Sequence, residues 1–318
     1  MLGERSHMGK TKRIPPLFND MFLRVFGTEE SKPATLALAN AVLRAAGAPE
    51  LERVDEISAD HTEPGGAVLK SPRLDVVIRC ETRLVDIEAQ RRAVDIHNKL
   101  LFYASKLIVA HTPKGEDPKF ERVPEIAIIT LLDGTTMFEG EQFLSAGRIH
   151  WERDGACIPG KGNPLFAVVE MDKFRRRYNK LTEEVLDDEL LSWLYLLVRG
   201  YENEKEVDAM SERFDAMVSF AREYGYALDD PKLERDFDRW LESEMEYNSA
   251  MHQMRKTALE EGLEEGLKKG RAQGRAQGLE EGRAQGLEEG RAQTTAEIAA
   301  KMRELGIDED IIAQATAG

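Results

Sequence analysis

Two carboxylates and one amide occur at a spacing that brings them to one point of a predicted sheet. Asp75 precedes Glu88 by 13 residues, and Gln90 follows Glu88 by two. The segments that carry them, 74–79 and 84–90, alternate apolar and polar residues, which is typical of β-strands. Because only a short turn separates the two segments, the sequence predicts an antiparallel hairpin.

Pairing Arg79 with Leu84 across that turn places Asp75 directly opposite Glu88. Directly opposed residues in antiparallel strands have Cβ atoms about 4.5–5.5 Å apart. Two ionised carboxylates at that distance repel unless a proton or a cation lies between them. Mg²⁺ suits such a pair, because it takes hard oxygen ligands and keeps several waters for chemistry. Gln90 shares a face with Glu88, because strand residues two apart point the same way.

A plain structural interpretation competes with the metal site. Asp75, Asp86, Glu88 and Gln90 would also form the solvated face of an ordinary hairpin. The next segment, 93–110, is predicted to be a helix with enough apolar residues to cover a sheet. Acids under such a helix are costly unless they bind something. Both interpretations remain open at this level.

The pattern Asp-x₁₂-Glu-x-Gln on a hairpin followed by a helix resembles the active site of the PD-(D/E)XK nuclease superfamily, in its Glu-x-Gln form. More narrowly, the chain resembles the bacterial Rpn family of recombination-promoting nucleases and transposases. The stretches that carry this resemblance are residues 19–27, 85–91 and 168–174, together with the glycine-punctuated tail. The resemblance implies an α/β fold: a restriction-endonuclease-like core, with a mixed sheet flanked by helices, and an all-helical C-terminal extension.

The resemblance also implies a Mg²⁺- or Mn²⁺-dependent DNA endonuclease linked to recombination or mobile elements. Asp75 and Glu88 would ligate the metal, and the main-chain carbonyl of Ala89 would add a ligand. Gln90 would stand where a lysine more often orients the attacking water. In such proteins an acid near the start of the first helix approaches the metal, and Asp20 is the candidate here. Glutamine has no charge, which leaves more of the activation to the metal.

The formal net charge of −15 opposes a DNA-binding function, because phosphate contacts normally need a basic surface. Acidic residues concentrate after Thr182, whereas basic residues cluster nearer the predicted site, at 91–92, Lys99, Lys106 and 173–180. Each basic cluster fits either a DNA track or an ordinary solvated face. A catalytically degenerate nuclease fold that acts as a scaffold or oligomer is therefore the alternative function, and a divalent-metal titration separates the two.

Composition predicts a cytoplasmic protein. No run approaches the roughly 18 apolar residues that a membrane span needs. The N-terminus lacks the apolar stretch of a signal peptide. Cys80 and Cys157 are the only cysteines, which gives no disulfide framework.

Four segments follow from the patterns: a nuclease-like core at 13–180, a helical region at 181–254, a glycine repeat at 255–293 and a short helical tail at 294–318. Within the core we expect helices at 19–27 and 34–46, and strands at 50–59, 124–132, 148–153 and 165–171, in addition to the hairpin and its helix.

The glycine repeat allows two structures. Glycine occupies every fourth position from 262 to 290, and each interior glycine costs about 1 kcal/mol of helix stability relative to alanine. The repeat is therefore either a helix that packs closely against another protomer or a flexible linker. The first alternative predicts a homo-oligomer assembled through the C-terminal helices.

Overall fold

The structure is a computed structural model of the 318-residue chain. It describes residues 12–62, 73–91, 95–112, 123–151, 155–158, 160 and 162–316. These residues form two compact units that divide between Trp240 and Leu241. The first unit contains a sheet and its covering helices, and the second consists of helix alone.

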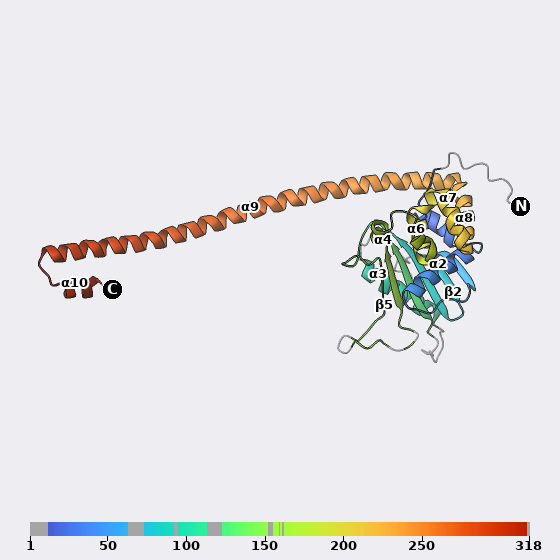
Figure 1. Cartoon of the computed structure of the whole chain (residues 1–318), viewed down its shortest axis with the longest axis horizontal. Coiled ribbons are helices and arrows are strands. Elements are labelled where there is room, and N and C mark those ends of the chain that lie inside the picture. Colours follow the sequence, from blue (N-terminus) through green and yellow to red (C-terminus); the bar gives the residue numbers. More distant parts are fainter. Residues whose placement is uncertain are drawn as a thin grey trace. The chain divides into compact units, whose positions relative to one another are not determined.

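The first unit is built on a six-stranded mixed sheet of order β1-β2-β3-β4-β6-β5 (Figure 1). β1, β2 and β3 are antiparallel, β3, β4 and β6 are parallel, and β5 runs antiparallel to β6 at the edge. The strands are β1 (Glu56–Thr62), β2 (Arg73–Cys80), β3 (Arg83–Gln90), β4 (Glu125–Leu132), β5 (Leu144–Gly147) and β6 (Leu165–Glu170). The predicted mixed sheet is confirmed.

The strands predicted at 124–132 and 148–153 have different outcomes in the structure. The apolar run at 124–132 forms β4, a central strand that is buried along nearly its whole length because helices, α3 among them, pack on the sheet's faces. Of the strand predicted at 148–153, the described residues 148–151 form only a single bridge, between His150 and Cys157, and the edge strand is β5, which ends at Gly147. Beyond that point the side chain of Asn163 bonds both the N–H and the carbonyl of Ile149, which holds the chain in a loop. Residues 152–154 lie outside the described part of the chain.

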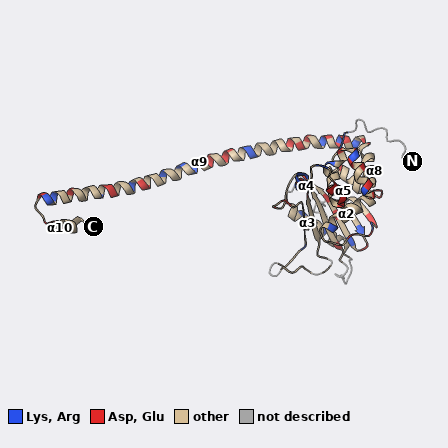
Figure 2. Ribbon diagram, in the orientation of Figure 1, with Lys and Arg blue, Asp and Glu red and all other residues tan. Residues whose placement is uncertain are grey.

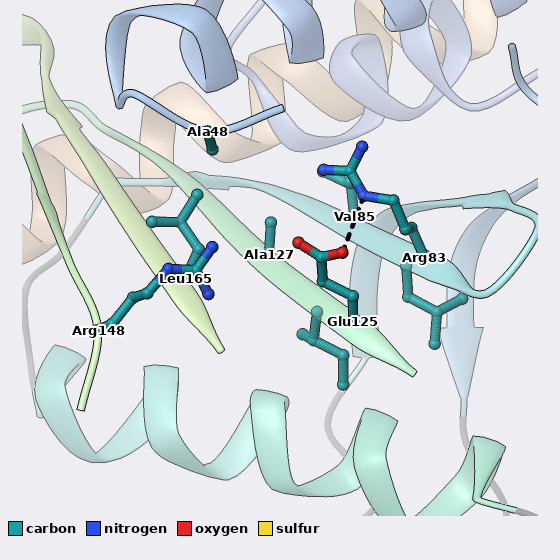
Figure 3. A pocket seen from close by; sticks show the side chains of 9 residues that line it. Ala48, Arg83, Val85, Glu125, Ala127, Arg148 and Leu165 are labelled. Carbon is teal, nitrogen blue, oxygen red and sulfur yellow. Dashed lines mark ion pairs between the residues drawn. The ribbon is translucent and has the colours of Figure 1, made fainter. Parts of the chain in front are cut away.

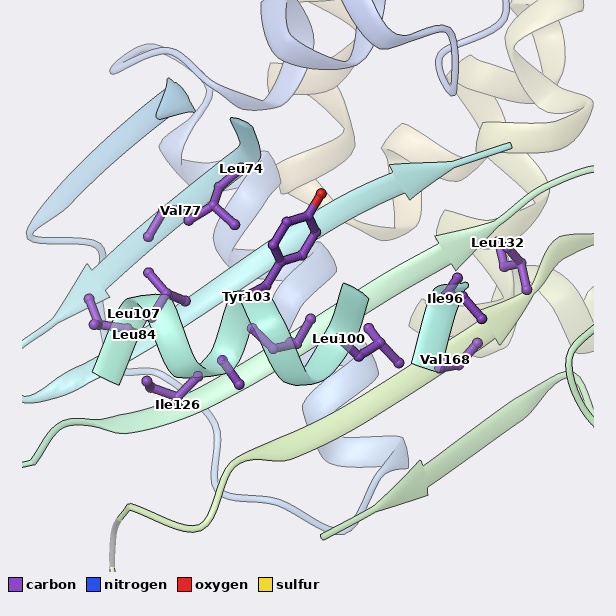
Figure 4. Close-up of a cluster of buried hydrophobic side chains, with 12 residues drawn as sticks. Leu74, Val77, Leu84, Ile96, Leu100, Tyr103, Leu107, Ile126, Leu132 and Val168 are labelled. Carbon is purple, nitrogen blue, oxygen red and sulfur yellow. The ribbon is translucent and has the colours of Figure 1, made fainter. Parts of the chain in front are cut away.

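One face of the sheet is covered by α3 (Ile96–His111), close to the helix predicted at 93–110 (Figure 4). Its inward side chains pack on β2, β3, β4 and β6. The buried cluster includes Ile96, Leu100, Tyr103, Ala104 and Leu107 of the helix with Val77, Leu84, Ile126, Ile128, Leu132 and Val168 of the strands. Full burial of one such side chain contributes about 1.5–3 kcal/mol. This face also carries the predicted site residues, so the acids lie under a helix.

Helices from both ends of the first unit pack together beside the sheet. They are α1 (Asn19–Phe26), α2 (Lys32–Ala45), α4 (Met171–Arg177), α5 (Glu183–Asp187), α6 (Glu189–Val198), η2 (Gly200–Glu202), α7 (Glu204–Arg213) and α8 (Asp215–Leu228). α8 contacts α1 and α2, and α6 contacts α2 and α4. The boundary predicted at residue 180 therefore differs from the division at Trp240, because the later helices complete the packing of the first ones.

The second unit consists of most of α9 (Pro231–Glu304) followed by α10 (Glu309–Thr316). The glycine repeat lies within α9, which continues through it as one helix (Figure 1). Lys, Arg, Asp and Glu are interspersed along the helix (Figure 2). α9 ends before Gly306, whose φ of 71° suits glycine. Among the described helices, none is long and apolar enough to cross a membrane.

Candidate active site

The predicted hairpin forms with the predicted register. Cys80 pairs with Arg83 and Arg79 with Leu84, and the ladder runs back to Val76 opposite Ile87. Glu81 at the turn has a φ of 54°, the left-handed conformation that two-residue hairpin turns require. One further step along this register brings Asp75 level with Glu88.

At that step the two acids bond the opposite backbone. The N–H of Asp75 donates to Oε1 of Glu88 over 3.1 Å, and the N–H of Ala89 donates to Oδ2 of Asp75 over 2.9 Å. Each carboxylate is therefore held by an amide of the other strand. This reciprocal pair fixes both side chains, and it places the backbone of Ala89 beside Asp75.

Asp86 is a buried acid, although the sequence alone allowed it to lie on a solvated face of the hairpin. It is fully buried, because α3 covers its face of the sheet, and among the described residues neither of its oxygens has a hydrogen-bond partner. The carboxylates of Glu88 and Asp75 act on Asp86 as nearby negative charges. A hydrogen bond between two carboxyl groups forms only when one of them holds a proton. Thr130, level with Glu88 on β4, also has a buried hydroxyl without a partner in the described chain.

This burial has a clear electrostatic consequence. Removal from water, with the nearby charge of Asp75, raises the pKa of Glu88 to about 8. Burial, followed by the charges of Glu88 and Asp75, raises the pKa of Asp86 well above its usual range. The solvated-face interpretation is therefore wrong for Asp86 and Glu88. The site holds more negative charge than it can keep ionised without a cation.

Gln90 meets two groups that the predicted site did not include. Its side-chain Oε1 accepts a hydrogen bond of 2.5 Å from Nζ of Lys99 on α3. Lys99 also lies 5.8 Å from the ring centroid of Tyr103. Burial and the charges of Glu88, Asp75 and Asp86 raise the pKa of the Tyr103 hydroxyl, which places that group beside the acids. The sequence contained a signal that Lys99 lies near the site. Lys99 precedes Tyr103 by four residues, so the two side chains lie on the same face of the helix, and Tyr103 points inward.

Asp20 stands apart from this group. It lies in the first turn of α1, half-buried, and accepts a bond of 3.3 Å from Asn19. That bond stays within α1, and among the described residues no hydrogen bond or ion pair links Asp20 to the hairpin. The structure thus joins Asp75, Glu88, Ala89 and Gln90 and does not join Asp20 to them.

The basic segment 173–180 divides into a structural part and an exposed part. Lys173 is buried and pairs with the buried Glu170 at 2.7 Å. Arg175 bonds Asp133, whose N–H donates to the carbonyl of Gln90. Arg176 and Arg177 are exposed. Since β3, β4 and β6 end in register, α4 starts at the same edge of the sheet as Gln90.

A shallow hollow lies at the opposite ends of these strands (Figure 3). Arg83 and Glu125 form an ion pair of 3.5 Å in its wall, and Arg83 also donates to the carbonyls of Pro49 and Glu50. Because its charged groups already have partners, this hollow is structural. The acids belong to the other end of β3.

Fold and site together define a nuclease-like protein: a mixed sheet with a hairpin of paired acids under a helix. The family model of PD-(D/E)XK nuclease family transposases matches residues 17–254, which is most of the chain. The chain therefore belongs to this family. No curated protein and no solved structure matches it.

The donor set fits a divalent metal of the kind that PD-(D/E)XK nucleases generally use. Asp75 and Glu88 supply hard oxygens, and the buried oxygens of Asp86 lack a donor. The described residues contain no group of three or more His, Cys, Asp or Glu side chains arranged as a cage. Mg²⁺ in phosphate-handling sites usually takes only one or two carboxylates and keeps waters, so two acids suffice.

Proposed function

We propose that the protein is a metal-dependent DNA endonuclease that hydrolyses phosphodiester bonds, with Mg²⁺ or Mn²⁺ as cofactor. The observation that carries this proposal is the pair Asp75 and Glu88, held by reciprocal backbone bonds and buried beside Asp86. Membership of a nuclease family supports the same reaction class.

In the proposed site Asp75, Glu88 and the carbonyl of Ala89 would hold the metal. When bound, the metal lowers the pKa of a water and stabilises charge on the phosphate. The chain's own part is to keep the ligands in place: Ala89 and Asp75 donate backbone N–H bonds that orient the two carboxylates. The cover of α3 over Leu84 and Ile128 keeps this part of the sheet dry, which strengthens electrostatic interactions there.

DNA would reach the site along the edge where β3 and β6 end. Arg176 and Arg177 of α4 are exposed at this edge and can contact phosphates. Lys173 cannot, because Glu170 holds it in the interior. A local basic surface of this kind offsets the formal charge of −15, much of which lies in the C-terminal helices.

The test is a nicking assay on supercoiled plasmid DNA with Mg²⁺, with Mn²⁺ and with a chelator. We expect cleavage with either metal and none with the chelator. A parallel calorimetric titration without DNA should show metal binding. If the protein binds no metal and cleaves nothing, it is the catalytically degenerate scaffold of the alternative function.

We also propose that the protein is a homo-oligomer joined through α9. A Cβ built on any glycine from Gly262 to Gly290 would meet nothing within 4 Å, so this stripe is open to a partner helix. Replacing Gly270, Gly274 and Gly278 by leucine should overfill a close helix contact and reduce the mass measured by light scattering. Alanine at the same sites is the matched control, since it adds one methyl and favours the helix. Unchanged mass in the leucine variant would contradict the proposal.

A further inference from the structure

Lys99 is a cation whose charge acts on Glu88. Its Nζ lies 2.5 Å from Oε1 of Gln90, although it belongs to α3 and Gln90 ends β3. The charge of Lys99 lowers the pKa of Glu88, against the larger effect of burial, so the ammonium lies near the acids. The contact thus crosses from the covering helix to the last residue of the hairpin.

The bond partner of Lys99 indicates what the lysine does. The Lys99 ammonium donates one hydrogen bond to the side-chain oxygen of Gln90, which carries no charge. An ammonium has three N–H groups, so two further N–H groups remain as donors. Lys173 shows the contrast, because its Nζ is enclosed by the Glu170 carboxylate and the carbonyl of Phe138. Lys99 is half-buried, with donors left for a group that enters the site.

We propose that Lys99 is a catalytic residue that donates hydrogen bonds to the phosphate undergoing hydrolysis, and that Gln90 positions it. The inference rests on the proposed nuclease function. The charge that position 90 lacks would then come from α3, and the glutamine would hold the ammonium at the end of β3.

The chemistry of the step balances without a proton from Lys99. The oxygen of a water forms the new bond to phosphorus, and the ester bond from phosphorus to the leaving oxygen breaks. The water loses a proton to solvent, and the leaving oxygen takes one up. Lys99 transfers no proton in this step, and its side chain stabilises the negative charge that grows on the non-bridging oxygens.

Four variants test the proposal by plasmid nicking, each with a Mn²⁺ titration in the absence of DNA and a melting curve. Lys99→Gln should lower the nicking rate by about 100-fold, the usual cost of one such donor. Its Mn²⁺ affinity should stay equal or rise, because a positive charge has left the site. Lys99→Arg should retain part of the activity. The double variant Gln90→Lys/Lys99→Gln, which moves the charge to the strand, should recover most of it.

Lys205→Gln is the matched control, since Lys205 is exposed on α7, outside the hairpin and α3, and loses the same charge. It should cleave like wild type. Nicking by Lys99→Gln at the wild-type rate would overturn the role of Lys99 alone. Loss of Mn²⁺ binding in step with nicking would also overturn it, since Lys99 would then only shape the site. A wild type that cleaves nothing with any metal would overturn the proposed function and this inference together.

Discussion

Two groups of buried carboxylates lie on the same sheet and are treated in opposite ways. Glu170, at the end of β6, accepts bonds from the N–H groups of Met137 and Phe138 and from Nζ of Lys173, at 2.6, 3.3 and 2.7 Å. Asp86, on β3, has no partner within the described residues and faces other acids. Both carboxylates are fully buried.

The difference separates stabilising charge from functional charge. A buried charge with a full set of partners holds elements together, and here Glu170 and Lys173 fix the segment around Phe138 to α4. A buried acid without partners lowers the stability of the fold, so such acids are found mainly at functional sites. Removing an acid from the repelling group should therefore keep or raise stability, whereas breaking the Glu170–Lys173 pair should lower it.

The largest expected effect is on cleavage. Asp75→Ala and Glu88→Ala should each abolish metal-dependent nicking, because either change removes a ligand that the site needs. The fold should stay intact or become slightly more stable, because the repulsion among the acids falls. Circular dichroism with the plasmid assay measures both effects. Full cleavage by either variant would remove these residues from the site.

The opposite effect is expected at the paired carboxylate. Lys173→Met should destabilise the protein by about 3–5 kcal/mol, because it leaves the Glu170 charge buried without its cation. Urea unfolding measures the loss. The double variant Glu170→Gln/Lys173→Met should lose less than the single one, since no unpaired charge remains. If the single variant is as stable as wild type, Glu170 is not the anchor that its contacts indicate.

Sequence patterns were sufficient for features that depend on local periodicity. Alternation in β2 and β3 predicted the hairpin, and its register brought Asp75 level with Glu88 before any tertiary contact was known. The segment 124–132 likewise predicted a strand, which forms β4. These features are carried by neighbouring residues, so the sequence contains them directly.

The rest depended on tertiary packing. Alternation cannot tell which face of a strand is covered, so Asp86 could not be distinguished from a solvated acid. Lys99 reaches Gln90 only because α3 crosses β3 at one particular rotation. The edge strand β5 has four residues, too few for its period to be recognised. Each of these features is decided by an element distant in sequence.

A smaller effect, on the pH dependence of stability, would sharpen the comparison. Glu88 has a pKa of about 8 in the folded protein and an ordinary value of 4.5. Between these values the folded state holds a proton that the unfolded chain has lost. The contribution of Glu88 to the stability of the metal-free protein is therefore full below pH 4.5 and is lost as the pH rises toward 8. One such group contributes a slope of at most about 1.4 kcal/mol per pH unit.

Glu88→Gln should flatten this slope, because the glutamine side chain does not titrate. Glu50→Gln is the matched control: the Arg44 side chain holds the pKa of Glu50 below its ordinary value, so its effect falls at lower pH. Urea unfolding in chelator at pH 5, 6, 7 and 8 measures the three slopes. Saturating Mn²⁺ should reverse the trend, since binding needs ionised ligands and stabilises the folded state. A Glu88→Gln variant with the wild-type slope would show that Glu88 is already ionised at pH 5, which would make it a paired carboxylate like Glu170.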